Sequence, residues 1–341
     1  MKFSTTIRTL AATAAFAAAS LALPCSARAG RLGPDIIGLF PKEVGEFAYA
    51  DLKQARSLKW FPQLKEQMIP ARFKQFEQFL ASAGIDPETQ VDELAWGLVA
   101  DKMSGKGAES ATAVPTGENI VGVALGSYNP SSAEAFFKTQ KLPTLKVRGY
   151  TLFAFGTGSG PNDLFFFFID SNTAAFGHRA LLEKMIEVRF GGEDGLLRNE
   201  TLYPLINEAN NGSGVVWAVL NPAYTRLAIR QLAPEIEQFP EAAKLVRRMK
   251  NLIINVEAGS SVDGHFQAVA GSTEDANSLS QLLQAGFLYK RYQAQQSNPD
   301  LAQLLDQVRV SPSGDRVDLR MTVNDEQMTG LIKHNTFALK M

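Results

Sequence analysis

The sequence predicts an α+β protein: two pseudo-repeated units of mainly antiparallel sheet with packed helices. Three observations predict this fold. Short segments rich in aromatic and aliphatic residues are typical of strands, and several are joined by glycine-containing turns that suit hairpins. Longer segments place apolar residues every three or four positions, which is the period of an amphipathic helix. The elements also follow one another in nearly the same order in both halves of the chain.

The N-terminus is typical of a secretory signal peptide over residues 1–29. A short basic stretch precedes an uncharged run over 10–23, and Ala27 and Ala29 occupy the small-residue positions before a cleavage site. The uncharged run is shorter than the roughly 20 residues that a permanent membrane helix needs. An uncleaved N-terminal anchor is the alternative interpretation. We expect a mature chain that begins at Gly30 and is periplasmic or secreted.

Composition excludes several classes of function. Cys25 is the only cysteine, so a chain without the signal peptide has no disulfide, thiolate metal site or cysteine nucleophile. The signal peptide holds three of the 34 basic residues and no acid, which leaves 31 basic against 35 acidic side chains and a net charge of −4. That charge gives no basic field to attract nucleic acid. We expect no nucleic-acid partner and no transmembrane segment in the mature chain.

The order of predicted elements gives the domain organisation. Each unit begins with a strand and helices, continues with two strands and a helix, and ends in a hairpin followed by a helix. The first unit has an extra strand. The predicted parts after the signal peptide are an N-terminal tail (30–42), a first α+β repeat unit (43–190), a connection (191–211) and a second α+β repeat unit (212–341).

Two pairs of matching segments support the repeat. Residues 48–52 match residues 217–221, and residues 123–127 match residues 268–272. In the second pair, each strand ends in Gly-Ser before a helix. The alternative is chance agreement between common elements. If the repeat is real, the two units should have the same strand order and pack together.

Two aromatic segments bear on packing and on ligand binding. Residues 165–168 are four consecutive phenylalanines, so we expect a strand that is covered on both faces, with Phe166 and Phe167 buried on opposite faces. Residues 52–83 read as helices bent near Pro70, with aromatic residues at helical spacing. Core packing is the favoured interpretation of that aromatic stripe, and a ligand groove is the alternative.

The sequence contains no recognisable catalytic or metal-binding motif. Its histidines, His178, His265 and His334, are far apart, and a metalloprotease or serine-hydrolase motif is absent. His178 directly follows a predicted strand and is the first candidate for a catalytic role, although a structural role is favoured. The acidic loop at 191–195 could contribute to a calcium site, but a turn is favoured. We therefore predict no catalytic, cofactor-binding or metal residue, and no cofactor.

The chain resembles exported bacterial proteins of unknown function with a duplicated α+β unit. The resemblance lies in layout, at residues 42–60, the Gly84-Ile-Asp-Pro87 turn, the strand-Gly-Ser-helix units and the final hairpin. It implies export and an α+β fold, and it brings no catalytic residues.

These observations lead to three hypotheses of function. The first is a non-enzymatic extracytoplasmic binding or interaction module, with an envelope protein as one candidate partner. The second is a carrier of an apolar ligand, suggested by the Phe-rich strand and the aromatic stripe. The third is a hydrolase with a carboxylate-based site that sequence spacing does not reveal.

Overall fold

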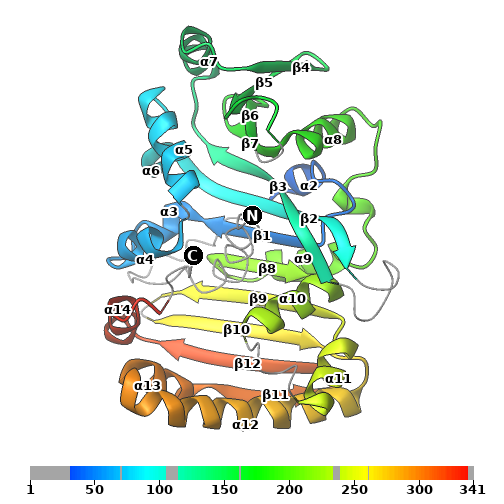
Figure 1. Ribbon diagram of the computed structural model, residues 1–341, viewed down its shortest axis with the longest axis vertical. Helices are drawn as coiled ribbons and strands as arrows, with labels where there is room; N and C mark the ends of the chain where they lie inside the picture. The colour runs from blue at the N-terminus through cyan, green and yellow to red at the C-terminus, as the bar shows by residue number, and fades with distance from the viewer. Residues whose placement is uncertain are drawn as a thin grey trace.

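The computed structural model describes residues 31–69, 71–104, 114–160, 163–232, 239–259 and 261–336. Runs of helices and runs of strands follow one another along the chain, in the α+β arrangement that the sequence predicts (Figure 1). The predicted signal peptide, 1–29, lies outside the described residues, as do residues 105–113 of the connection between two long strands.

The elements fall into two parts along the chain. The first part contains α2 (Pro34–Ile37), β1 (Glu46–Asp51), α3 (Leu52–Ala55), α4 (Phe61–Met68), α5 (Ala71–Ser82), α6 (Pro87–Gln90), β2 (Val91–Ser104), β3 (Val114–Gly126), α7 (Pro130–Thr139), β4 (Thr144–Val147), β5 (Tyr150–Phe155), β6 (Leu164–Phe168), β7 (Thr173–His178) and α8 (Arg179–Arg189). The second part contains a short 3₁₀ turn (Leu196–Arg198), α9 (Tyr203–Asn210), β8 (Val216–Leu220), α10 (Pro222–Leu232), α11 (Pro240–Arg248), β9 (Asn251–Ala258), β10 (Val262–Val269), α12 (Thr273–Ser297), α13 (Pro299–Gln307), β11 (Arg309–Ser313), β12 (Arg316–Val323) and α14 (Asp325–Lys333).

The described strands join in one sheet of 12 strands with antiparallel neighbours, in the order β11-β12-β10-β9-β8-β1-β2-β3-β7-β6-β5-β4. The two parts of the chain meet where β1 pairs with β8, with Tyr49 opposite Trp217. Outward from this pair, the first part has the order β1-β2-β3-β7 and the second has the order β8-β9-β10-β12. Each part thus begins with its first three strands and continues with its last strand, and its remaining strands lie beyond. In Figure 1 the blue β1 lies beside the green β8, and the strands extend from there to β4 at one end and β11 at the other.

Helices cover the two faces of the sheet unequally. Alternate residues along a strand point to opposite faces, and in β1 Ala48 packs in one core cluster while Phe47 and Tyr49 pack in another. The core clusters on the Ala48 face, the helix-rich face, include residues of α3–α5, α7 and α10–α14. The opposite face packs against α2, α8 and α9.

The prediction for the phenylalanine run is confirmed. Phe166 is 5% exposed and packs on the helix-rich face, whereas Phe167 is 2% exposed and packs in the cluster of the opposite face. The ring of Phe166 lies among those of Phe76 and Phe137, and the ring of Phe167 lies 5.0 Å from that of Tyr150. Strand β6 is therefore covered on both sides, although its neighbour β5 is followed only by the short β4.

The segments predicted to be a tail and a connection are packed into the fold. Leu32 and Phe40 are buried on the opposite face, and the Asn210 side chain holds the Leu32 backbone with two hydrogen bonds of 2.9 and 3.0 Å. Ile206, within the predicted connection, is fully buried on the same face. Residues 30–42 are too short to show a clear periodic pattern. In the predicted connection, Leu202, Ile206 and Ala209 do recur at helical spacing, and they form the buried side of α9, a helix that the sequence prediction missed.

Candidate ligand-binding cavity

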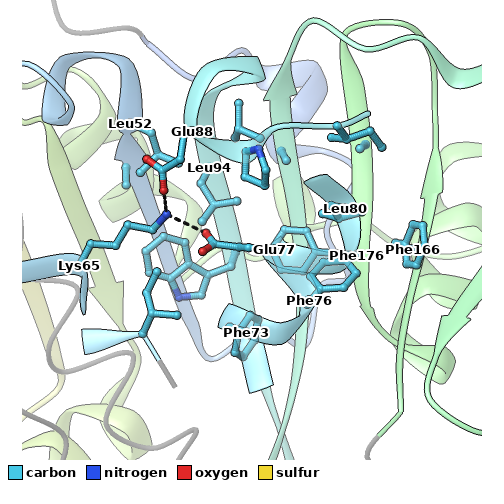
Figure 2. Close-up of a pocket in the computed structure, with 18 of the residues that line it drawn as sticks. Leu52, Lys65, Phe73, Phe76, Glu77, Leu80, Glu88, Leu94, Phe166 and Phe176 are labelled. Atoms are coloured by element: carbon cyan, nitrogen blue, oxygen red, sulfur yellow. Dashed lines mark hydrogen bonds and ion pairs between the residues drawn. The ribbon is translucent and has the colours of Figure 1, made fainter. Parts of the chain in front are cut away.

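A cavity of about 280 Å³ lies between the helix-rich face of the sheet and the segment that joins β1 to β2. We call α3, α4, α5 and α6 the roof helices, because they form one side of the cavity, and the strands opposite them the floor. Figure 2 shows the labelled lining residues converging from both sides. The volume is close to the lower end of the roughly 300–1,000 Å³ that is typical of small-molecule sites.

Small residues in the floor strands leave the space open. Ala124 of β3 and Ala174 of β7 lie opposite each other in the register and both line the cavity. Two register positions further along, on the same face, the Phe176 ring covers Gly122, where a Cβ atom would lie 2.2 Å from the ring. Gly122 therefore lets Phe176 lie flat against the sheet, and Phe176 becomes part of the cavity wall.

The roof contributes apolar side chains at helical spacing. Phe61 and Met68 come from α4, and Phe73, Phe76 and Leu80 come from α5. The sequence favours core packing for this aromatic stripe, and these residues pack in or against the core clusters while they also line the cavity. Phe76 is 8% exposed and belongs to one cluster, and Phe61 and Phe73 are partly buried and pack against another.

One charged group, which we call the Lys65 cluster, joins three roof helices at the cavity. The Nζ atom of Lys65, in α4, lies 3.0 Å from Oε1 of Glu77 in α5 and also contacts the carboxylate of Glu88 in α6 (Figure 2). All three residues line the cavity. The Lys65 side chain is 19% exposed and that of Glu88 is 57% exposed, so the cluster extends from the cavity wall to solvent.

Burial and pairing act in opposite directions within this cluster. Burial lowers the pKa of Lys65, but the contacts with Glu88 and Glu77 outweigh it and leave that pKa above its ordinary value. For Glu77 burial is the larger effect, and it raises the pKa of the carboxyl group although Lys65 lies beside it. The ion pair with Lys65 therefore offsets only part of the free-energy cost of placing the Glu77 carboxylate in an apolar environment.

Arg56, which directly follows α3, connects this end of the roof with α6 and with the start of β2. Its guanidinium group donates hydrogen bonds to the carbonyl oxygens of Glu88 at 2.7 Å and Val91 at 2.8 Å, and it lies 3.4 Å from Oδ1 of Asp92. Arg56 lines the cavity, but its guanidinium N–H groups already donate to these backbone and side-chain oxygens.

The lining is poor in the side chains that usually act as nucleophiles or general bases. Among the described residues that line the cavity there is no serine, threonine, cysteine or histidine. The carboxylates of the lining, Glu77 and Glu88, both contact the Lys65 ammonium group. A general acid and base need to face the reacting bond, so this pairing gives no support to the carboxylate-based hydrolase.

The three histidines lie outside the cavity lining. His178, at the end of β7, is buried, and its Nδ1 atom accepts a hydrogen bond of 2.9 Å from the Ile120 backbone N–H. His265 lies 2.6 Å from Asp318 on neighbouring strands, and His334 lies 3.5 Å from Asp300. His178 thus has a structural contact between strands.

The acidic loop at 191–195 makes a surface contact. Asp194 lies 3.3 Å from the Lys42 ammonium group, and both side chains are largely exposed. Within the described ranges, no group of three histidine, cysteine, aspartate or glutamate side chains could hold a metal ion. In the same part of the chain, no helix combines the length and apolar character needed to cross a bilayer.

The fold resembles that of TP0453. In one crystal form of this treponemal protein, the match has a TM-score of 0.51 at 9% sequence identity and covers 89% of this chain and 98% of that chain. A second crystal form gives 0.50 at 11% identity, with coverage of 91% and 100%. The sequence matches no protein-family model and no curated protein. TP0453 is a bacterial protein of unknown function, so the likeness concerns the fold alone.

Proposed function

We propose that this protein is a non-enzymatic, extracytoplasmic binding protein that takes a small apolar molecule into the cavity between the roof helices and the sheet. The observation that carries the proposal is the cavity lining. Apart from Arg56, Lys65, Glu77 and Glu88, the lining consists of apolar residues and Tyr128. A concave site of this kind, with a few polar groups at one place, is the usual form of a small-molecule site.

The energetics favour an apolar occupant over water. A water molecule in a buried site needs two to four polar partners, and the floor side chains, such as Leu94, Phe166 and Phe176, offer none. A ligand that covers such side chains gains about 25 cal/mol for each Å² of apolar surface removed from water. This argument selects the carrier hypothesis from the three that the sequence leaves open.

Fluorescence of the neutral dye N-phenyl-1-naphthylamine tests this proposal. We expect the dye to brighten in the presence of the protein and to lose its binding in Ala174→Phe, because the new ring projects from the floor into the cavity. The matched control is Ala285→Phe, which adds the same ring to an exposed position on α12.

A second, milder variant guards against misfolding of Ala174→Phe. Ala124→Leu also narrows the cavity from the floor and should weaken the dye by a smaller factor. Circular dichroism establishes that each variant is folded. If both folded variants bind the dye as the unaltered protein does, or if the unaltered protein does not bind it, the cavity is not the binding site.

We also infer export and an internal repeat. The layout of residues 1–29 supports export. The repeat is supported by the strand order, because both sides of the β1–β8 pair place three strands in sequence and then the last strand of their part. On this interpretation the first unit carries an additional hairpin, and the roof helices are the feature that adapts one unit to binding.

A further inference from the structure

The Lys65 cluster has an excess of negative charge at the place where the apolar cavity meets solvent. One ammonium group, that of Lys65, contacts two carboxylates, those of Glu77 and Glu88. The described contact of the Glu77 carboxylate is with Lys65, and its side chain is 33% exposed, so a ligand group can replace solvent at its remaining accepting positions. The cluster can therefore accept further hydrogen bonds and a further positive charge.

Among the described side chains, the neighbouring cations already pair with other acids. Arg56 and Lys53 both lie within 4 Å of Asp92, at 3.4 and 3.7 Å. Lys74, which lies one turn before Glu77 in α5, contacts Glu66 of α4. Of the charged residues that line the cavity, Arg56 also donates to backbone carbonyl groups.

We propose that the cavity binds an amphiphile whose polar head is cationic or an uncharged hydrogen-bond donor, with the head against Glu77 and Glu88 and the apolar chain between the roof helices and the floor. The proposal rests on the function proposed above and names the class of ligand. An amine gains a carboxylate partner, and a hydroxyl group donates to Glu77. A fatty-acid anion meets two carboxylates for one ammonium group and is disfavoured.

The position of Glu77 is consistent with this choice. The residue belongs to α5, which also presents Phe73, Phe76 and Leu80 to the cavity, so a ligand chain that packs on these side chains brings its head to the same helix. In Figure 2 the Glu77 carboxylate points from α5 toward Lys65, within the ring of apolar side chains. A head group that donates a hydrogen bond there reduces the cost of burying the carboxylate.

Competition against bound N-phenyl-1-naphthylamine at neutral pH tests the ligand class. Dodecylamine, dodecanol and dodecanoate share one chain and differ in the charge of the head. We expect dodecylamine to displace the dye at a concentration about tenfold lower than dodecanoate, because charges about 4 Å apart near a protein surface interact strongly. Dodecanol should lie between them.

The variant Glu77→Gln/Glu88→Gln reverses the charge of the cluster, since it leaves the Lys65 ammonium group unopposed. We expect the order of the competitors to invert, with dodecanoate the strongest, while the neutral dye still binds. The control is Glu43→Gln/Glu187→Gln, which removes two carboxylates that pair with Lys184 and Arg148 elsewhere on the surface. It should keep the original order.

Each outcome decides between the two proposals. If the dye binds and the three competitors act equally, or the order survives Glu77→Gln/Glu88→Gln, the ligand class is wrong while the binding function stands. If the dye does not bind the unaltered protein, both proposals fall. If the order of the competitors inverts in Glu77→Gln/Glu88→Gln and is kept in Glu43→Gln/Glu187→Gln, the result supports both the binding function and the ligand class.

Discussion

Lys65 connects three of the roof helices through one side chain. Its ammonium group reaches Glu77 and Glu88 from α4, so a single side chain links three helices that are separated along the chain by Pro70 and by the Gly84 turn. Gly84 has a φ of +77°, a left-handed conformation that favours glycine. No atom lies within 4 Å of where a Cβ atom would be, so the backbone conformation, and not lack of space, is what requires glycine at this turn. The placement of the roof thus depends on side-chain contacts.

The raised pKa of Glu77 predicts a pH dependence of stability. A carboxyl group whose pKa is higher in the folded than in the unfolded protein contributes stability that is present below the unfolded pKa and is lost as the pH rises through the folded pKa. We therefore expect the stability of the unaltered protein, relative to Glu77→Gln, to be greater in acid than at neutral pH.

Thermal unfolding of the unaltered protein and of Glu77→Gln, from acid to neutral pH, measures this pH dependence of stability. Glutamine does not titrate, so the difference between the two melting temperatures isolates Glu77 from the other ionisable groups. A difference that is constant with pH would mean that pairing with Lys65 balances burial, and one that grows toward neutral pH would mean that pairing outweighs it; either result contradicts the prediction.

The Lys65 cluster could not be predicted from the sequence. Lys65 and Glu77 lie in different helices, and their contact depends on how sharply the chain bends between α4 and α5. Neither residue matches a motif, and charged residues at this spacing are common on solvated helices. The aromatic residues beside them do carry a signal, because their helical period marks the apolar side of each helix.

At the scale of elements, strand β6 separates two cores, and this separation predicts different consequences for neighbouring residues. Phe166→Ala and Phe167→Ala should each cost about 3–5 kcal/mol of stability, since both rings are buried. Phe166 lines the cavity and Phe167 does not. We expect only Phe166→Ala to change the affinity for N-phenyl-1-naphthylamine.

Chemical denaturation and dye titration measure the two effects separately. Phe190→Ala is the control, because Phe190 is 54% exposed and its loss should leave both measurements nearly unchanged. Equal effects of Phe166→Ala and Phe167→Ala on dye affinity would show that binding responds to general loosening and not to the cavity wall.

Element types were more predictable than element positions in the sheet. The phenylalanine run and the final helix at 325–333 have strong local patterns, and both lie where the sequence predicts them. Strand β4 (Thr144–Val147) was missed, because four residues that include Lys146 give too short an alternation to stand out. The pairing of β1 with β8 joins residues far apart in the chain, which no local pattern reports.

At the scale of the whole molecule, the continuous sheet predicts cooperative unfolding. The β1–β8 pair lies at its centre, and α4 adds a second link between the parts: Gln67 donates a 2.7 Å hydrogen bond to the Ile332 carbonyl oxygen of α14, and Trp60 is buried in the same cluster as Leu331. Neither part can unfold without exposing apolar surface of the other.

Val323→Ala tests this coupling from the second part of the chain. Val323 is 2% exposed, and its truncation should cost about 2 kcal/mol. We expect hydrogen exchange of the β6 amides, in the first part, to accelerate as much as that of the β10 amides when exchange requires global unfolding. Acceleration confined to β9–β12 and α14 would mean that the two parts unfold independently.

The register between β1 and β2 places Asp51 directly opposite Glu93, so the chain leaves the sheet and returns to the facing position. Everything between these residues, including α3 to α6, occupies the place of a hairpin turn. Much of the roof of the cavity therefore lies in one insertion between two paired strands, and the register of β1 and β2 continues on either side of it. If the proposed function holds, substitutions at the cavity-facing positions between residues 52 and 90 give natural variation and protein engineering the same way to change the ligand, as long as Trp60 and Leu64 keep their buried contacts with the rest of the core.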